Sequence, residues 1–91
     1  MSDEPYDIEW TSSARRSLDR IPEKAATACV EFVYGALAEN PQRVGRELRL
    51  ELLGKQSARR GDFRVIYEID DERRVVTVIA IDHRSDVYRP R

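Results

Sequence analysis

The feature that most constrains this chain is a pair of strongly apolar segments separated by five charged residues. Residues 63–69 and 75–81 are rich in Val, Ile and aromatic side chains, and Asp70-Asp71-Glu72-Arg73-Arg74 lies between them. Segments of this composition on either side of a short polar turn are typical of a β-hairpin. The second segment is apolar on both sides, as in a strand that is covered on both faces. The sequence therefore predicts an antiparallel hairpin whose second strand lies inside a sheet.

The N-terminal part of the chain predicts one strand followed by two helices. Apolar and acidic side chains alternate over residues 6–10, which is the period of a strand with one buried face. The Thr-Ser-Ser run at 11–13 can then cap a helix whose apolar residues recur at helical spacing as far as Ile21. Pro22 suits the first turn of a second helix, which continues to Glu39 before an Asn-Pro pair ends it. Because almost no linker separates them, the two helices should form an antiparallel hairpin.

Residues 41–56 leave two interpretations open. The alternating leucines from 48 to 52 fit either a short strand or an ordered loop. The order of one strand, two helices and about three strands predicts an α+β domain, in which helices cover one face of a single, mainly antiparallel sheet. In the first strand of the hairpin, Arg64, Ile66 and Glu68 should point to the face without helices.

Length and composition limit the class of protein. A chain of 91 residues supports one hydrophobic core, so residues 1–91 should form a single domain. With 41% apolar and 36% charged residues, the composition is typical of a globular protein. No apolar run is long enough to span a membrane, and the acidic segment 1–7 does not resemble a signal peptide. Cys29 is the only cysteine, which excludes an internal disulfide and fits a reducing compartment, so we expect a cytoplasmic protein without membrane contact.

Charge is distributed unevenly along the chain. Residues 1–40 hold four basic and eight acidic side chains, a net charge of −4, whereas residues 41–91 hold twelve basic and nine acidic side chains, a net charge of +3. A polyanionic partner such as a nucleic acid would therefore meet the C-terminal half. Charge alone favours the other interpretation, which is the mixed surface that any soluble domain carries.

The candidate site is a set of basic and aromatic residues in the C-terminal half. No nucleotide-binding loop, zinc-ligand spacing or cysteine-based catalytic pattern is present, so neither a metal nor a cofactor is expected. Closing the hairpin places the start of its first strand beside the end of its second, so Arg64 should lie near residues 83 and 84. The resulting candidates are Lys55, Arg59, Arg60, Arg64, His83, Arg84 and Tyr88.

Such a cluster suits the cleavage of RNA by its own 2′-hydroxyl. This reaction needs a base, an acid and cations that stabilise the negative charge at phosphorus. Arginine stays protonated and cannot be the base, but its planar fork binds two phosphate oxygens at once. With only these groups, an enzyme would gain most from a partner that holds the RNA in an in-line geometry, since positioning can supply roughly 7–11 kcal/mol. The ribosome can be that partner.

Three segments of the chain resemble the RelE/ParE superfamily of toxins, and its RelE-type branch in particular. They are the run SARRGDFRVIYEID at 57–70, the run IDHRSDVYR at 81–89, and the pattern W-T-x-x-A-x-x-x-L-x-x-I-P at 10–22. The resemblance implies a RelE-like fold and a ribosome-dependent endonuclease that cuts mRNA in the decoding site. It also implies a cognate antitoxin that wraps the toxin, with operator DNA bound only through that complex.

The resemblance also implies roles for individual residues. Arg64 matches an arginine that grips the scissile phosphate, and Arg84 matches a second phosphate or leaving-group contact. Tyr88 matches a tyrosine that stacks on or orients a base. Lys55 falls near a basic pair whose second position holds Ser57 here, so the identity of the general base stays open. His83 is our own candidate for it, because an unperturbed histidine pKa near 6.5 suits proton transfer at neutral pH.

Several residues have a structural interpretation beside the functional one. An intrastrand ion pair with Glu68 would account for Arg64, and packing of the tail would account for Tyr88. Arg59 and Arg60 are interpreted as contacts to ribosomal RNA or to the antitoxin, or as ordinary surface. Tyr67, Trp10, Phe32 and Cys29 are expected in the core.

Two other functions compete with the nuclease. The first is a ParE-like inhibitor of DNA gyrase that has the same fold and no nuclease chemistry. The second is a non-enzymatic partner of an operon repressor. From the exposed surface and the resemblance, we expect the antitoxin to supply an acidic or amphipathic segment that lies along the helices or fills the arginine-lined face.

Overall fold

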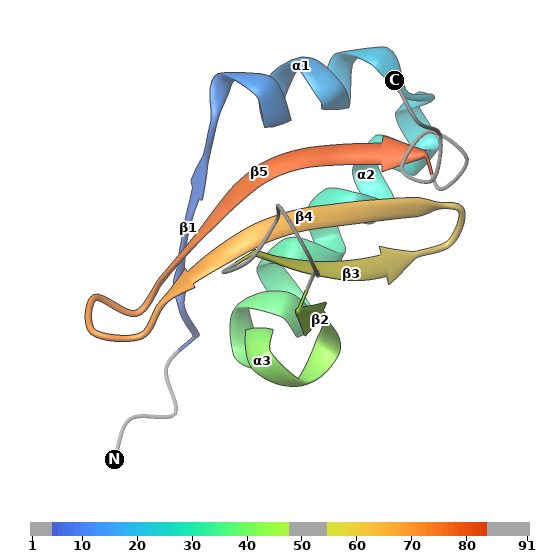
Figure 1. Ribbon diagram of the computed structural model, residues 1–91. Coiled ribbons are helices and arrows are strands. Elements are labelled where there is room, and N and C mark those ends of the chain that lie inside the picture. The colour runs from blue at the N-terminus through green and yellow to red at the C-terminus, as the bar shows by residue number, and fades with distance from the viewer. Residues whose placement is uncertain (1–4, 48–54, 84–91) are drawn as a thin grey trace.

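The computed structural model describes residues 5–47 and 55–83, which build one mixed sheet with helices packed against it (Figure 1). In chain order the elements are β1 (Asp7–Trp10), α1 (Ser12–Arg20), α2 (Glu23–Phe32), the π-helical η1 (Val33–Leu37), α3 (Pro41–Val44), β2 (Arg46–Glu47), β3 (Gln56–Arg60), β4 (Phe63–Asp70) and β5 (Val75–His83). The strand order in the sheet is β1-β5-β4-β3-β2. β1 pairs with β5 in parallel, and the three other pairings are antiparallel. The predicted α+β fold with a mainly antiparallel sheet is confirmed.

The β4–β5 hairpin is the centre of the sheet, as the sequence predicts. The turn that joins its strands covers residues 71–74, and Arg74 completes it with a left-handed backbone at φ 53°. β5 has a neighbour along each edge, β1 on one side and β4 on the other. β5 therefore lies inside the sheet, and its residues Val76, Val78 and Ile81 are buried in the core.

Thr11 fixes the start of α1 to the sheet. Its hydroxyl accepts a hydrogen bond from the backbone N–H of Ala14 at 3.0 Å, which caps the helix. The same hydroxyl donates to the backbone carbonyl of Ile79 on β5 at 2.8 Å. The helix ends at Ile21, because the following Pro22 pushes the residue before it into an extended conformation.

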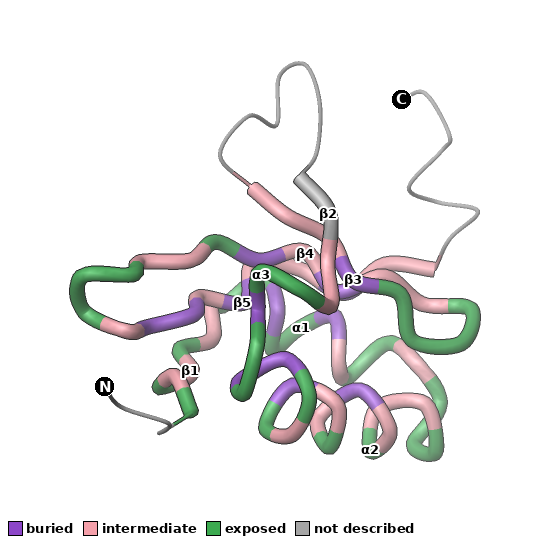
Figure 2. Tube along the Cα trace, turned by 90° about the horizontal axis from the view of Figure 1, so that it is seen from below, coloured by how far each residue is buried: buried purple, intermediate pink, exposed green. Residues whose placement is uncertain are grey.

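The helices lie together on one side of the sheet (Figure 2). α2 runs without a break into η1, and helical conformation continues to Glu39, where the sequence predicts the end. Apolar residues from this helix and from the inner face of the sheet form the core, which includes Val33, Leu37, Val65, Val76, Val78 and Ile81. Cys29 lies in this core as well, as expected.

Tyr67 of β4 belongs to the core and contacts the start of α3. Its ring is fully buried, and its hydroxyl donates to the backbone carbonyl of Pro41 at 2.6 Å. Burial raises the pKa of Tyr67 to about 12, since the phenolate would be poorly solvated there. Gly45 passes so close that any side chain at this position would overlap the Tyr67 hydroxyl and the backbone carbonyl of Ser57.

The segment 41–56 combines α3, the short edge strand β2 and the first residue of β3. The leucines at 48, 50 and 52 lie outside the described residues. β3 as a whole is a strand that the sequence did not predict, because four of its five residues are polar or basic and only Ala58 is buried.

Candidate functional site

The candidate site lies on the outer face of the sheet, which we define as the face opposite the helices. In β4, Val65 and Tyr67 are buried under the helices, so the alternating residues Arg64, Ile66 and Glu68 point outward. None of the described helices covers this outer face (Figure 2). The predicted division of β4 into two faces is confirmed.

The strand register places a row of three charged residues across the outer face. Arg64 on β4 lies directly opposite Arg59 on β3 and directly opposite Asp82 on β5. Directly opposed residues in an antiparallel sheet have their Cβ atoms about 4.5–5.5 Å apart and project from the same face. Arg59 is exposed, whereas Arg64 is partly covered and its Nε atom is buried. The three residues therefore form one compact group, which we call the arginine row.

Lys55 lies on the same face but further along the strands. Its Nζ is 3.6 Å from Oε1 of Glu68, and both side chains are partly exposed. Glu68 thus has Lys55 as an ion-pair partner on the neighbouring strand.

His83 lies on the other face of the sheet. It is directly opposite Phe63 on β4, and the two rings meet edge to face with centroids 5.4 Å apart. With Ser17, Ile21 and Pro22, they line a hollow of about 350 Å³ beside α1. This corrects the expectation that His83 and Arg64 belong to one cluster. The period of the strand carries the signal that was missed, since His83 is two residues from the buried Ile81.

Arg60 also leaves the group that the sequence predicted. It lies opposite Phe63 and lines a small hollow with Ala25 and Ala28 of α2. Burial raises the pKa of the Cys29 thiol, and the Arg60 guanidinium partly offsets this rise. Arg59 and Arg60 are neighbours in sequence but serve opposite faces. Arg84 and Tyr88, the remaining predicted site residues, lie outside the described residues.

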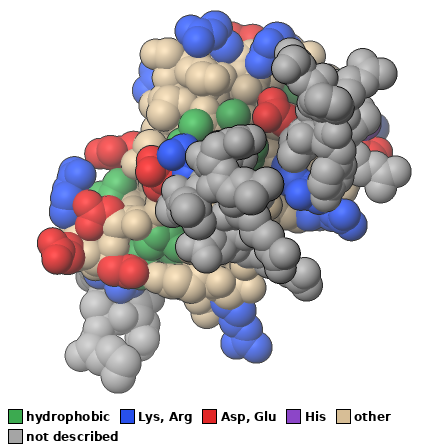
Figure 3. All heavy atoms as spheres, in the orientation of Figure 1, with side chains coloured by type: hydrophobic (Ala, Val, Ile, Leu, Met, Phe, Trp, Pro, Cys, Tyr) green, Lys and Arg blue, Asp and Glu red, His purple; other side chains and the backbone are tan. Residues whose placement is uncertain are grey.

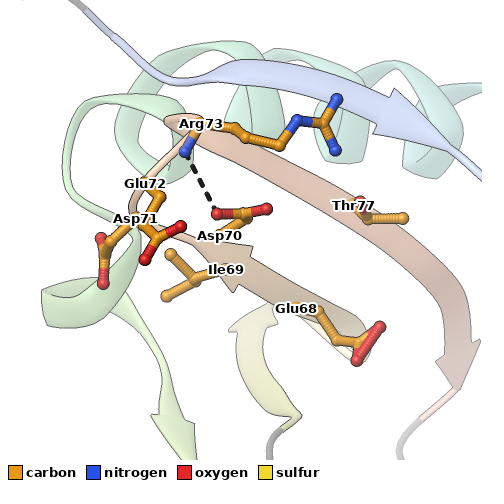
Figure 4. Close-up of a pocket in the computed structure, with 7 residues that line it drawn as sticks. All are labelled: Glu68, Ile69, Asp70, Asp71, Glu72, Arg73 and Thr77. Carbon is orange, nitrogen blue, oxygen red and sulfur yellow. Dashed lines mark hydrogen bonds between the residues drawn. The ribbon is translucent and has the colours of Figure 1, made fainter.

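The opposite end of the hairpin is acidic. Figure 3 shows acidic side chains gathered at the left-hand end of the molecule, where the β4–β5 turn lies. A hollow of about 500 Å³ opens there, lined by Glu68, Asp70, Asp71, Glu72 and Arg73 together with Ile69 and Thr77 (Figure 4). The Asp70 carboxylate accepts the backbone N–H of Arg73 at 3.1 Å, which holds the turn. Its negative charge makes this hollow unsuited to a phosphate.

The described residues hold neither a metal-ligand group nor a membrane-spanning helix. Residues 5–47 and 55–83 contain no group of three or more His, Cys, Asp or Glu side chains placed to hold a metal ion. No helix within these ranges combines the length and apolar character that crossing a bilayer requires.

Sequence comparisons connect the whole length of the fold to one family. The family model described as the ParE toxin of the type II toxin–antitoxin system parDE matches residues 8–88. The chain is 54% identical to Toxin RelE of Mycobacterium tuberculosis over 87 residues, which cover 96% of this chain and 90% of that protein. It is 48% identical to Toxin RelG of the same organism over 85 residues, covering 93% of this chain and 98% of that protein.

Solved structures give the same result. The RelBE2 toxin–antitoxin complex from M. tuberculosis contains a chain that matches with a TM-score of 0.85 at 46% identity, covering 93% of this protein and 100% of that chain. The Escherichia coli RelBE complex matches with a TM-score of 0.72 at 18% identity, covering 86% of this protein and 95% of that chain, which shows a shared fold. The sequence comparisons and the structure comparisons thus identify the same relatives. The chain belongs to the RelE/ParE family and is a RelE-type toxin of a type II toxin–antitoxin system.

Proposed function

We propose that this toxin is a metal-independent, ribosome-dependent endoribonuclease that inhibits translation by cutting mRNA. The observation that carries the proposal is the arginine row, in which the strand arginine Arg64 stands on the outer face beside a second arginine. Two relatives of about 50% identity that bear the names RelE and RelG support the same activity. Arginines bind phosphate oxygens without needing a metal, since their fork matches the geometry of the phosphate.

In the proposed reaction, the 2′-oxygen of the RNA attacks the adjacent phosphorus. The new 2′-O–P bond forms as the P–O5′ bond breaks, which leaves a 2′,3′-cyclic phosphate and a 5′-hydroxyl. The proton of the 2′-hydroxyl passes to a base, and an acid supplies a proton to the departing 5′-oxygen. Arg64 binds the phosphate, Arg84 is proposed as a second contact, and Tyr88 is proposed to orient a base. Lys55 is proposed as a contact to RNA on the same face.

The position of His83 bears on which residue transfers protons in the proposed reaction. The described groups on the outer face that can move a proton are Lys55, Glu68 and Asp82, whereas His83 packs on Phe63 beneath the sheet. His83→Ala separates the two assignments. A loss of cleavage rate of about 100-fold or more would assign proton transfer to His83, in line with the size of general acid–base effects. A loss of a few fold would assign it to the outer face.

The test of the proposed function is in-vitro translation with mapping of the ends of cleaved transcripts. The wild-type toxin should cut mRNA only when ribosomes are present. Arg64→Ala should lower the rate by about 10²- to 10³-fold, since it removes one stabilising donor at the phosphate. A wild-type toxin that leaves every transcript intact under these conditions would refute the proposal.

The second candidate is a gyrase inhibitor of the ParE type, which the description of the matching family model favours. The ParDE complex of Pseudomonas aeruginosa matches with a TM-score of 0.67 at 24% identity, so it shares the fold. Cells that express the toxin distinguish the candidates. Cut transcripts support the nuclease, and DNA-damage signalling without cut transcripts supports the gyrase inhibitor.

We also propose a cognate antitoxin as the partner that silences this toxin. Relatives of this chain have been solved as RelB–RelE complexes from M. tuberculosis and E. coli. The basic row on the outer face suits an acidic or amphipathic segment of such an antitoxin. Operator DNA is expected to be bound through the complex, because the toxin's own net charge is −1. Co-expression with the neighbouring open reading frame should restore growth and yield a stable complex.

A further inference from the structure

We propose that Arg59 and Arg64 together form a clamp for a single phosphodiester, in which Arg59 is a direct phosphate contact and not a general surface charge. The inference deepens the proposed nuclease function and rests on it for the identity of the phosphate as RNA. It starts from the register, which puts the two arginines directly opposite each other on neighbouring strands. No other directly opposed pair among the described strand residues joins two basic side chains.

Two like charges in directly opposed positions disfavour the folded state. Opposite charges at such positions stabilise a sheet by roughly 0.2–1 kcal/mol, whereas like charges directly opposite each other destabilise it. An anion that accepts hydrogen bonds from both guanidinium groups converts this repulsion into attraction. The arrangement is therefore one that a bound phosphate would complete.

The carboxylates of this face do not neutralise Arg59. Arg59 is exposed and forms no ion pair with any residue of the described ranges. Asp82 lies on the far side of Arg64, so the width of β4 separates it from Arg59. Two strand spacings amount to about 10 Å, at which exposed charges are largely screened at physiological salt.

Within the described ranges, the rows next to the arginine row hold no second directly opposed pair of basic residues. The next row along the strands contains Ser57, Ile66 and Ala80, which carry no charge, and the register position of β2 opposite Ser57 holds Arg46. Beyond it, Lys55 and Glu68 form an ion pair and cancel each other. The arginine row contains two arginines and one carboxylate, so it carries a net positive charge.

The chemistry of cleavage has a use for two facing arginines. As the 2′-oxygen adds, the two non-bridging oxygens of the phosphate gain negative charge together. One guanidinium on each side of the phosphorus gives each of these oxygens its own charged donors, which are stronger than neutral ones. Arg64 is partly covered, whereas Arg59 is exposed and therefore accessible to an RNA phosphate.

The first test measures anion binding directly and does not need nuclease activity. Inorganic phosphate is titrated into the full-length toxin, and the side-chain Nε–H signals of the arginines are followed by NMR. We expect Arg59 and Arg64 to respond with one common saturation curve. Arg59→Ala should weaken the response of Arg64 by roughly tenfold or more, as expected for the loss of a hydrogen bond to a charged group.

Arg60→Ala is the matched control for this titration. It removes the same charge one residue away, but from the face that contacts α2. The response of Arg64 should therefore stay as in the wild type. The clamp would be overturned if Arg64 responded in Arg59→Ala as it does in the wild type, or if its response weakened equally in Arg60→Ala. The absence of any saturable response in the wild type would also overturn it.

The second test uses programmed ribosomes and separates the clamp from the proposed function. Single-turnover cleavage should fall about 10²-fold in Arg59→Ala and recover in part in Arg59→Lys, while Arg60→Ala stays within a few fold of wild type. If Arg64→Ala abolishes cleavage and Arg59→Ala does not reduce it, the clamp is wrong and the nuclease stands. If the wild type does not cleave, the nuclease proposal fails, and the phosphate titration alone decides whether the two arginines form an anion site.

Discussion

The two ends of the β4–β5 hairpin carry opposite charges and use them differently. At the turn, Asp70 accepts a backbone N–H, and Asp71 accepts the Tyr6 hydroxyl and the Gln42 amide at 2.6 Å each. At the other end, Arg59 and Arg64 face each other across β3 and β4, and Arg59 pairs with no described carboxylate. The carboxylates at the turn form hydrogen bonds within the protein, whereas the exposed arginine of the arginine row is accessible from outside. Stability and activity should therefore separate along this one hairpin.

The largest effect is expected at the arginine row. Arg64→Lys keeps the charge but replaces the planar fork by a single ammonium group, so it should slow cleavage by about 10- to 100-fold. Urea unfolding should show little change in the free energy of unfolding. A wild-type cleavage rate in this variant would mean that a single positive charge at position 64 is sufficient for cleavage. The two ends of the hairpin would then differ in function only through their charge.

At the turn, the opposite result is expected. Asp71→Ala removes the acceptor of two hydrogen bonds that join the N-terminal segment, α3 and the turn, and should lower the free energy of unfolding by about 1–2 kcal/mol. Cleavage by the folded fraction should be unchanged. Glu72→Ala, an exposed neighbour, serves as the control and should leave stability nearly unaltered. A drop in cleavage rate in Asp71→Ala at full folding would contradict the separation.

Tyr67 is buried in the middle of β4, between the two ends of the hairpin. Substituting it tests how much this middle part contributes to stability. Tyr67→Phe loses the hydrogen bond to Pro41 and should cost about 1 kcal/mol of stability. The raised pKa of Tyr67, about 12, also has a sign that can be checked. The folded state holds this proton more tightly than the unfolded state, so the contribution is complete below pH 10 and is lost as the pH rises toward 12. Tyr67→Phe should flatten the fall in stability over that interval, and an equal slope in both proteins would contradict the assignment.

The smallest effect is expected from Arg73 at the turn. Its guanidinium is 3.7 Å from Glu9, and the two side chains are 65% and 54% exposed. An exposed pair of this kind contributes at most a few tenths of a kcal/mol, so Arg73→Ala should barely change the unfolding curve. Cleavage should stay within about twofold of wild type. Because Arg73→Ala and Arg64→Ala remove the same side chain from opposite ends of one hairpin, their comparison shows whether the position of an arginine matters.

Much of the fold could be predicted from the sequence because its signals are local. The hairpin, its turn, the N-terminal strand, the cap at Thr11 and the helical end at Glu39 all depend on neighbouring residues. β3 was missed because its sequence, Gln-Ser-Ala-Arg-Arg, offers one buried side chain and hence no alternation of apolar residues. The parallel pairing of β1 with β5 joins residues nearly seventy positions apart, and a pattern within one segment does not specify it.

The site was predicted in composition but only partly in arrangement. Proximity in sequence suggested that Arg59 acts with Arg60, and closure of the hairpin suggested that His83 acts with Arg64. The sheet separates these pairs, because successive residues of a strand point to opposite faces and pairing depends on register. The opposition of Arg59 and Arg64 follows from a two-residue turn at Gly61-Asp62, whose length fixes which residues face each other.

The parallel pairing of β1 with β5 has a consequence for how the protein folds during its synthesis. A ribosome releases β1 first and β5 last among these strands, so the first strand must wait without its neighbour while the helices and the other strands are made. Closing a loop of this size carries an entropic cost that local hairpins avoid, and contacts between distant segments slow folding. The residue that completes the arginine row, Asp82, also belongs to the late strand. A nascent chain should therefore be harmless until its synthesis is nearly complete, which leaves time for an inhibitor to be present when the finished toxin appears.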